Sequence, residues 1–424
     1  MDGTVFVDTN LSPCYPYSIY IAVSEFEIAY HRGKYYMTYR LPLFYIVCIF
    51  FWMALYAYVP YVTPYAEQMD ADLRLIGLIA GAYGFVQMVI RFPLGIFSDK
   101  VQKRKIFVLI GLFFAALGGL VVYFFSHPVA LLVSRSFGGV TAATWVTFTI
   151  LGASYYKQED TIKSIGVLNA ANGFGRMTAL FLGGLVAEWM GFSYAFLLAG
   201  VFGIVGLILG FWMVEKKPEA GADGSSSNAP SFTDLLDVAK NRQLLTASIL
   251  AILSQYIMFA TTFGFTPMVA TGMGASNVQL GLLGMVSTLP ALLVSPFMAG
   301  VVKKTGIAVA LAVLFTFSGV GTILVAFCDN LVQLFAAQIL SAVGLAGLMT
   351  ILMGLSIRDI DAERRAAAMG FFQAVYGLGM FLGPFVVGLT GHGVGLMPAF
   401  IVTGMIGIVG AIASVICVNK KYLI

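Results

Sequence analysis

Three arginines interrupt otherwise apolar stretches of the sequence: Arg91, Arg135 and Arg176. An arginine at the centre of a bilayer costs about 2.5–3.5 kcal/mol even on the mild insertion scale, so each one needs a partner or a water-filled cavity. The guanidinium fork matches carboxylate and phosphate oxygens, so the functional interpretation is a polar cavity that attracts an anionic group. The structural interpretation is that the arginines bond helix carbonyls or polar side chains and hold the bundle together; for Arg91, a structural gate role is favoured.

Arg135 and Arg176 are expected at similar depth in the membrane. Arg176 follows the predicted helix start at Ser164 by 12 residues, about 18 Å at 1.5 Å per residue. Arg135 follows the start of the preceding predicted helix at Val129 by 6 residues, which places it about 21 Å above the same surface in a core of about 30 Å. Two amides precede Arg176 by about one and two helical turns, and the internal repeat adds two polar side chains opposite them. The candidate substrate or coupling site is Arg135, Arg176, Asn172, Asn169, Gln373 and Tyr376.

The amino-acid composition indicates an integral membrane protein. Hydrophobic residues make up 59% of the 424 residues and charged residues only 10%, whereas soluble proteins carry roughly 25% charged residues. The basic residues behind the formal charge of +4 are dispersed between apolar runs, so no nucleic-acid partner is expected. The 4 cysteines show no CxxC spacing and the 3 histidines lie far apart, so we expect no metal, no cofactor and no enzymatic activity.

Twelve apolar runs have the length of about 20 residues that crosses a bilayer as a helix. The expected fold class is therefore all-α, a polytopic membrane protein with 12 transmembrane helices. The predicted spans are residues 41–62, 75–98, 106–125, 129–156, 164–187, 194–214, 244–265, 278–302, 306–327, 331–356, 366–389 and 397–418.

Lysine and arginine are unevenly distributed between the two sets of loops. Of the 24 residues of these types, 20 lie at one set of helix ends and only Arg74 lies at the other. Cytoplasmic loops carry the excess of Lys and Arg. Both termini are therefore predicted to be cytoplasmic, in a multi-pass protein of the plasma (cell) membrane.

The predicted organisation is two similar six-helix bundles joined by a linker. We expect a cytoplasmic leader (1–40), an N-terminal bundle (41–214), a linker rich in Gly and Ser (215–243), a C-terminal bundle (244–418) and a cytoplasmic tail (419–424). The linker composition is typical of a flexible segment, with a short interfacial helix predicted near its end.

A shift of 204 residues superposes the fifth and sixth spans on the eleventh and twelfth without a gap. Gly184 falls on Gly388 at this shift, whereas Arg176 falls on Met380, so that charge belongs to one half only. Two halves in the same orientation imply a repeat axis along the membrane normal, which is typical of transporters.

Two motifs carry a family resemblance. The loop after the second span reads Gly95-Ile-Phe-Ser-Asp99-Lys100-Val-Gln-Lys103-Arg104-Lys105 and resembles Gly-x-x-x-Asp-Arg-x-Gly-Arg-Arg, a signature of the major facilitator superfamily (MFS). The fourth span reads Arg135-Ser-Phe-Gly138-Gly139-Val-Thr-Ala-Ala143, similar to the second signature of that family, Arg-x-x-x-Gly followed by small residues. The resemblance covers residues 41–418 and implies two pseudo-symmetric bundles that work by alternating access. The Gly-x-x-x-Gly-Pro signature of drug/proton antiporters is absent at residues 175–183 and occurs at 379–384 instead.

The resemblance also implies a cytoplasmic gate. In the family, the Asp of the first motif helps to close the cytoplasmic side against the start of the eleventh span, which follows Arg364 and Arg365 here. The shift of 204 residues converts Asp99 into Lys303 and Arg364 into Asp160, so complementarity survives the exchange. Two pseudo-symmetric latches between the halves are predicted: Asp99 with Arg364 or Arg365, and Lys303 or Lys304 with Glu159 or Asp160. The candidate gate residues are Asp99, Lys100, Arg104, Arg91, Arg364, Arg365, Lys303, Glu159 and Asp160.

The expected function is secondary active transport of a small solute, with an organic anion as the favoured substrate class. The alternatives are a drug/proton antiporter and, from another class, a non-transporting receptor on the same fold. No Asp, Glu or His lies at mid-depth, and such residues usually carry coupling protons. Uniport, anion exchange and proton coupling through groups at helix ends therefore remain open. The expected partners are a small-molecule substrate, the lipid bilayer and, in a coupled mechanism, an ion; the chain is expected to be a monomer.

Overall fold

The computed structural model describes residues 41–101, 103–156, 161–215, 240–361 and 364–418. Within these ranges the chain is helical and contains no strand. The predicted leader, the predicted tail and most of the linker, including the predicted interfacial helix, lie outside the described residues.

The N-terminal half begins with a span over Leu41–Gln68, which includes η1 (Val59–Tyr61) and α2 (Val62–Gln68). The sequence expectation ended this span at residue 62. The span is longer because Pro60 is accommodated in the first turn of η1, where its missing N–H costs no hydrogen bond. The remaining helices are α3 (Leu73–Val101), α4 (Arg104–Phe124), α5 (Pro128–Ala143), α6 (Trp145–Ser154), α7 (Thr161–Met190) and α8 (Phe192–Phe211).

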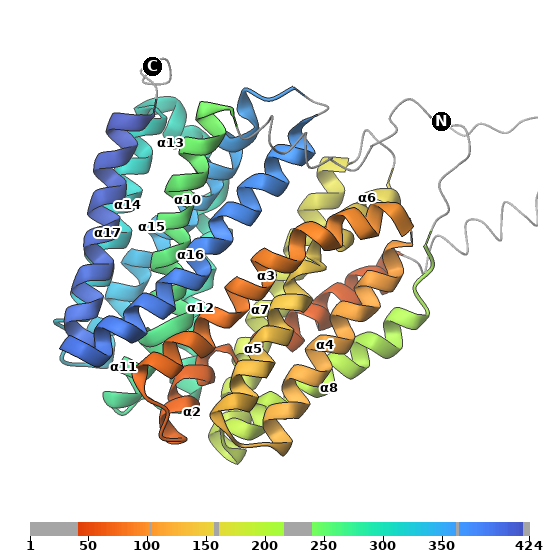
Figure 1. The fold of residues 1–424 in the computed structure, drawn as a ribbon, viewed down its shortest axis with the longest axis horizontal. Helices are drawn as coiled ribbons and strands as arrows, with labels where there is room; N and C mark the ends of the chain where they lie inside the picture. Colours follow the sequence, from red (N-terminus) through yellow and green to blue (C-terminus); the bar gives the residue numbers. More distant parts are fainter. Residues whose placement is uncertain (1–40, 102, 157–160, 216–239, 362–363, 419–424) are drawn as a thin grey trace, which may run out of the picture.

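The C-terminal half repeats this order. Its first rod is interrupted by a π-helical turn, η3, and its second by a 3-10 turn, η4. The elements are α10 (Arg242–Ala260), η3 (Thr261–Phe265), α11 (Thr266–Gly272), α12 (Asn277–Val294), η4 (Ser295–Phe297), α13 (Met298–Thr305), α14 (Ile307–Val325), α15 (Leu331–Arg358), α16 (Arg365–Val394) and α17 (Leu396–Cys417). Figure 1 shows the two bundles side by side, with α3 and α16 adjacent between them.

Equivalent turns in the two halves use the same local chemistry. Gly191 between α7 and α8 has φ 97°, and Gly395 between α16 and α17 has φ 92°. This left-handed region is strained for residues with a Cβ, so glycine ends one helix and starts the next. The two glycines are 204 residues apart, and the sharp turn is therefore part of the repeat.

Eleven helical rods in the described part of the chain are long and apolar enough to cross a membrane. The rod missing from that set is α7, which has 30 residues but a less apolar composition. Asn172 and Arg176 lower its hydropathy. The membrane-length helix that fails on composition in the described part of the chain thus carries half of the six candidate site residues.

The two halves meet closely at glycines. A Cβ on Gly77 of α3 would lie 2.9 Å from the Cα of Gly388 in α16, and a Cβ on Gly281 of α12 would lie 3.3 Å from the Cα of Gly184 in α7. Small residues let helix backbones approach in membranes. These two crossings hold the bundles together near the end that carries α2 and α11, which we call the acidic end. The other end, with Lys303, Lys304, Arg364 and Arg365, is the basic end.

Candidate functional site

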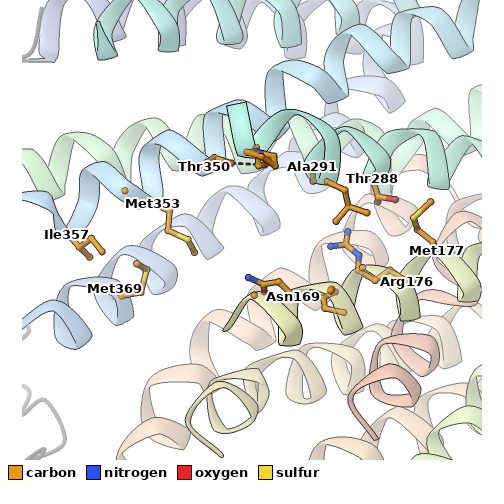
Figure 2. Close-up of a pocket in the computed structure, with 17 residues that line it drawn as sticks. Asn169, Arg176, Met177, Thr288, Ala291, Thr350, Met353, Ile357 and Met369 are labelled. Atoms are coloured by element: carbon orange, nitrogen blue, oxygen red, sulfur yellow. Dashed lines mark hydrogen bonds between the residues drawn. The ribbon is translucent and has the colours of Figure 1, made fainter. Parts of the chain in front are cut away.

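A cavity of about 710 Å³ lies between the two halves. The N-terminal half lines it with one face of α7, and the C-terminal half lines it with α12, η4, α15 and α16. The lining extends to Ile357 and Met369, which lie near the basic ends of α15 and α16. Figure 2 shows Arg176 projecting from α7 toward α12 across this space. The volume is within the range of small-molecule sites.

Arg176 is held in place by aromatic rings. Its guanidinium carbon lies 4.3 Å from the ring centroid of Tyr56 and 5.9 Å from that of Trp52. Both rings belong to the first span and are separated by one helical turn. Such cation–π contacts stabilise a desolvated guanidinium without neutralising its charge. The Nε atom of Arg176 is buried and has no hydrogen-bond partner among the described residues.

Asn169 and Asn172 line the same cavity as Arg176. Spacings of three, four and seven residues put these side chains on one face of a helix. The Oδ1 atom of Asn172 is also buried without a hydrogen-bond partner among the described residues. Buried polar groups usually have partners, so this face of α7 presents unmet hydrogen-bonding capacity next to a positive charge.

Arg135 does not line the large cavity. It is 3% exposed, and its guanidinium carbon lies 4.7 Å from the ring centroid of Tyr83. It borders a much smaller space, together with Tyr56. Arg135 and Arg176, which the sequence places in one cavity, therefore border two different spaces; Tyr56 borders the smaller one, and its ring lies against the Arg176 guanidinium.

Aromatic pairs between the halves close the space around Arg135. Tyr56 meets Phe263 with ring centroids 5.9 Å apart, and Tyr83 stacks on Phe259 at 5.8 Å. Phe263 lies in the π-helical turn η3, where the backbone makes a wider turn than in an α-helix. π-Bulges recur at functional sites, and this one places an aromatic ring over the arginine space.

Tyr376 contacts a predicted gate residue rather than the large cavity. Its hydroxyl accepts a hydrogen bond from Arg91 Nη1 at 3.3 Å, and Arg91 Nη2 donates to the carbonyl oxygen of Ala142 at 3.4 Å. Arg91 therefore ties α3 to α5 and, across the interface between the halves, to α16. Gln373 is half-buried on α16 and does not line the cavity either.

A hydrogen-bonded closure lies at the acidic end. The carboxylate of Glu188, near the end of α7, accepts from the backbone N–H groups of Asn277 at 2.7 Å and Val278 at 3.3 Å. These N–H groups open α12 and have no partner within their own helix. Asn277 Nδ2 donates in turn to the carbonyl oxygen of Ala187 at 2.9 Å. The carboxylate also suits the positive end of the helix dipole.

The predicted gate residues at the basic end are only partly described. Lys303, Arg364 and Arg365 are exposed, and Arg365 Nε donates to the carbonyl oxygen of Ile360 at 3.2 Å. The backbone N–H of Arg104 donates to a carboxylate oxygen of Glu215 at 2.7 Å. Asp99 and Lys100 belong to the last turn of α3. The side chains of these two residues, and residues 159–160 as a whole, lie outside what the structure describes.

Several cavity residues were not predicted from the sequence. Trp52 and Tyr56, whose rings contact Arg176, lie one helical turn apart, and only their shared helix face could have indicated them. The lining from the C-terminal half carries no charge and looks like ordinary apolar helix surface, so no sequence signal marks Thr288, Thr350, Met353 or Met369. Within the described ranges, no group of three or more His, Cys, Asp or Glu residues is placed to hold a metal ion.

The sequence matches a protein-family model over both halves. Residues 44–276 and 249–421 match the model of the Major Facilitator Superfamily. The chain therefore belongs to that family and is a polytopic membrane transporter rather than an enzyme. This match confirms the resemblance that the two motifs indicated.

Relatives and solved structures agree with this assignment. The chain is 26% identical over 369 residues to an uncharacterised MFS-type transporter of Methanocaldococcus jannaschii, covering 85% of this chain and 93% of the relative. It is also 26% identical over 283 residues to a homologue of the multi-drug resistance efflux pump PmrA from Lactococcus lactis, covering 65% of this chain and 68% of that one. A mutant of the nucleoside transporter NupG superposes with a TM-score of 0.76 at 15% identity, over 89% of this chain and 100% of that chain. A bacterial homologue of the lysosomal transporter Spinster, crystallised in an inward-facing state, also gives 0.76 at 12% identity, over 90% and 97% of the two chains.

Proposed function

We propose that the protein is a secondary active transporter that carries a small organic anion across the cell membrane by alternating access. The observation that carries this proposal is Arg176, which lies in the cavity between the halves with its charge stacked on aromatic rings and its Nε without a partner. A carboxylate would supply the missing hydrogen bonds and neutralise the charge. Carboxylate binding would also explain why the chain keeps a guanidinium in the membrane despite the free-energy cost of placing a charge there.

The basic end faces the cytoplasm in this proposal, as the excess of Lys and Arg favours. The cavity between α7 and the C-terminal half then reaches toward the cytoplasmic side, while the aromatic pairs and the Glu188 closure seal the outer side. Both termini are cytoplasmic, and the monomer is the transporting unit because the cavity is built within one chain.

Counterflow in proteoliposomes tests the proposal. The reconstituted protein is loaded with candidate organic anions, and uptake of the labelled anion is compared between the native chain and Arg176→Met, which copies the equivalent residue of the other half. A hydrogen bond to a charged group contributes about 1.5–3 kcal/mol, so the apparent affinity should fall roughly 10- to 150-fold. Arg74→Met is the matched control, because Arg74 is exposed at the acidic end. An unchanged affinity in Arg176→Met would remove Arg176 from the site, and binding without counterflow would indicate a receptor.

Drug efflux is the second candidate function. The similarity to the Lactococcus lactis efflux pump homologue supports it, as does the apolar lining from the C-terminal half. A cationic drug, however, would have to share the cavity with an unpaired guanidinium. Including cationic drugs in the counterflow panel separates the two candidates, since efflux predicts drug transport that Arg176→Met improves or leaves unchanged.

A further inference from the structure

The cavity between the halves is chemically polarised. Among the described residues that line it, Arg176 is the one charged side chain. The buried Nε of Arg176, which can donate to an anion, also has no hydrogen-bond partner among the described residues. An anionic group is therefore expected to bind against α7, beside Arg176.

Two threonine hydroxyls on the C-terminal half already donate hydrogen bonds within that half. Thr350 donates to the Ser295 hydroxyl at 2.8 Å, and the Thr288 hydroxyl donates to the carbonyl oxygen of Met285 at 3.0 Å. A ligand gains little from displacing such internal hydrogen bonds. These two threonine hydroxyls therefore offer little to a substrate, and the Ser295 hydroxyl, which accepts from Thr350, is an uncharged group on this side.

The rest of that side is apolar, and we call it the apolar wall: Ala291, Leu292, Pro296, Met353, Ile357 and Met369. Met353 is 39% exposed and Leu292 is 45% exposed, so both side chains are available to a ligand. Figure 2 shows Met353, Ile357 and Met369 gathered at one end of the cavity, away from the Arg176 guanidinium. Methionine side chains adapt to irregular apolar shapes, so this wall suits apolar bodies of varied outline.

We propose that the substrate is an amphipathic monoanion, with one carboxylate-like head on Arg176 and an apolar body against the apolar wall. This inference rests on the proposed anion transport and names its substrate class. A single guanidinium neutralises one negative charge, so a second carboxylate would be buried against an apolar surface without a partner. A cavity of about 710 Å³ also leaves most of its space unfilled by an inorganic anion or acetate, whereas a body of several carbons removes the apolar wall from water.

Calorimetric titration of the purified protein with straight-chain monocarboxylates from butyrate to octanoate tests the proposal. Burial of each methylene should raise the affinity roughly fourfold until the cavity is filled. Octanedioate should bind at least tenfold more weakly than octanoate, because its second carboxylate meets the apolar wall. Octanamide should also bind at least tenfold more weakly, because it lacks the charge that Arg176 recognises.

Variants locate the body of the ligand. The double substitution Met353→Ser with Met369→Ser should reduce the gain per methylene to about twofold. Met405→Ser is the matched control, since Met405 is 55% exposed on α17, outside the cavity, and the gain per methylene should stay near fourfold.

The outcomes separate the two proposals. An affinity that requires the carboxylate but does not change with chain length would overturn the amphipathic substrate and leave anion transport intact. Equal or tighter binding of octanedioate would overturn the single charge. If octanamide binds as tightly as octanoate and the gain per methylene persists, the proposed anion transport is wrong and the apolar wall alone is the binding surface. A gain per methylene that the double variant leaves at fourfold would place the apolar body elsewhere.

Discussion

The two halves of the molecule share their packing but not their charges. A Cβ on Gly77 would lie 2.5 Å from the carbonyl oxygen of Pro384, and a Cβ on Gly281 would lie 2.5 Å from that of Leu180. Both the glycines and their carbonyl partners are 204 residues apart. The crossing of α3 with α16 and that of α12 with α7 therefore use the same contact.

The intramembrane arginines break this symmetry. Each lies in the N-terminal half and has an uncharged counterpart 203 or 204 residues away: Ser295 for Arg91, Gln338 for Arg135 and Met380 for Arg176. Gln338 is 1% exposed and bonds to Thr262 at 2.7 Å, and Ser295 bonds to Thr350. A duplicated scaffold with one-sided charge predicts that the anion stays on the N-terminal half while the C-terminal half moves across it.

The largest expected effect comes from breaking the shared scaffold. Gly77→Ala and Gly281→Ala each force the backbones apart, since the new Cβ meets a carbonyl oxygen rather than a flexible side chain. Overpacking costs about 1–3 kcal/mol, so each variant should shift the equilibrium away from the closed acidic end by roughly five- to 150-fold. Labelling of a cysteine introduced by Val59→Cys, which borders the small space beside Arg135, measures that opening.

Similar shifts in the two variants are expected from equivalent crossings. Gly300→Ala serves as the control, because a Cβ there meets nothing within 4 Å. If only one glycine variant opens the acidic end, the two crossings do not act as equivalent contacts.

The shared scaffold is also the part that the sequence predicts best. The pairing of Gly184 with Gly388 can be recognised from the constant shift alone, without knowing which helices touch. Close approach of two helix backbones requires a small residue at both positions, so the pattern is visible in the sequence. The apolar wall, by contrast, was invisible in the sequence. Met353 and Met369 resemble lipid-facing residues until the packing of α15 and α16 against α7 shows that they border a cavity.

Arg135 shows a second limit of sequence reasoning. Its depth follows from counting residues along a helix, but its separation from Arg176 depends on where Tyr56 places its ring. Side-chain packing between helices decides that, and helical periodicity does not encode it.

The next prediction sharpens the comparison at Arg135. Arg135→Gln copies the counterpart in the C-terminal half and removes the charge beside Tyr83. Because Arg135 does not line the cavity, binding of an anion from the basic end should remain within about twofold of the native value. Counterflow should fall by up to about 30-fold, since loss of a desolvated cation–π contact costs up to about 2 kcal/mol along the transport cycle.

Titration of the anion and counterflow on the same preparation check that split. Gln338→Asn is the control, because it changes the counterpart residue without adding a charge. It should affect anion binding and counterflow equally. If binding and counterflow both fall to the same extent in Arg135→Gln, Arg135 takes part in substrate binding.

A smaller effect is expected at the closure of the acidic end. Glu188→Gln keeps an acceptor oxygen for the N–H groups of Asn277 and Val278 but removes the charge at the start of α12. A charge at a helix end is worth about 0.3–1 kcal/mol, so labelling of Val59→Cys from the acidic end should increase roughly two- to fivefold. His392→Gln is the matched control, since His392 is the exposed counterpart 204 residues away. An equal change in both variants would show that the closure does not depend on the Glu188 carboxylate.

The smallest expected effect concerns the basic end, where the comparison between halves predicts two complementary latches with reversed signs. Asp99 should pair with Arg364 or Arg365 and the start of α16, and Lys303 should pair with Glu159 or Asp160. Lys303, Arg364 and Arg365 are exposed, and exposed pairs contribute only about 0.2–1 kcal/mol each. That is too little to hold the fold, yet it changes the ratio of two states of similar free energy by up to about fivefold.

Charge reversal tests this pairing directly. Asp99→Arg should raise the accessibility of a cysteine at Met353, on the lining of the cavity near the basic end, because the reversed charge repels Arg364 and Arg365. Adding Arg364→Asp and Arg365→Asp should restore the native accessibility, since the pair is then re-formed with opposite signs. The reversal should also weaken at high salt, because exposed charges are screened. Arg365 already donates to the carbonyl oxygen of Ile360, so Arg365→Asp alone is expected to rescue less than Arg364→Asp alone. If neither change rescues Asp99→Arg, Asp99 acts on the N–H groups at the start of α16 or within its own loop, and the two latches are not counterparts.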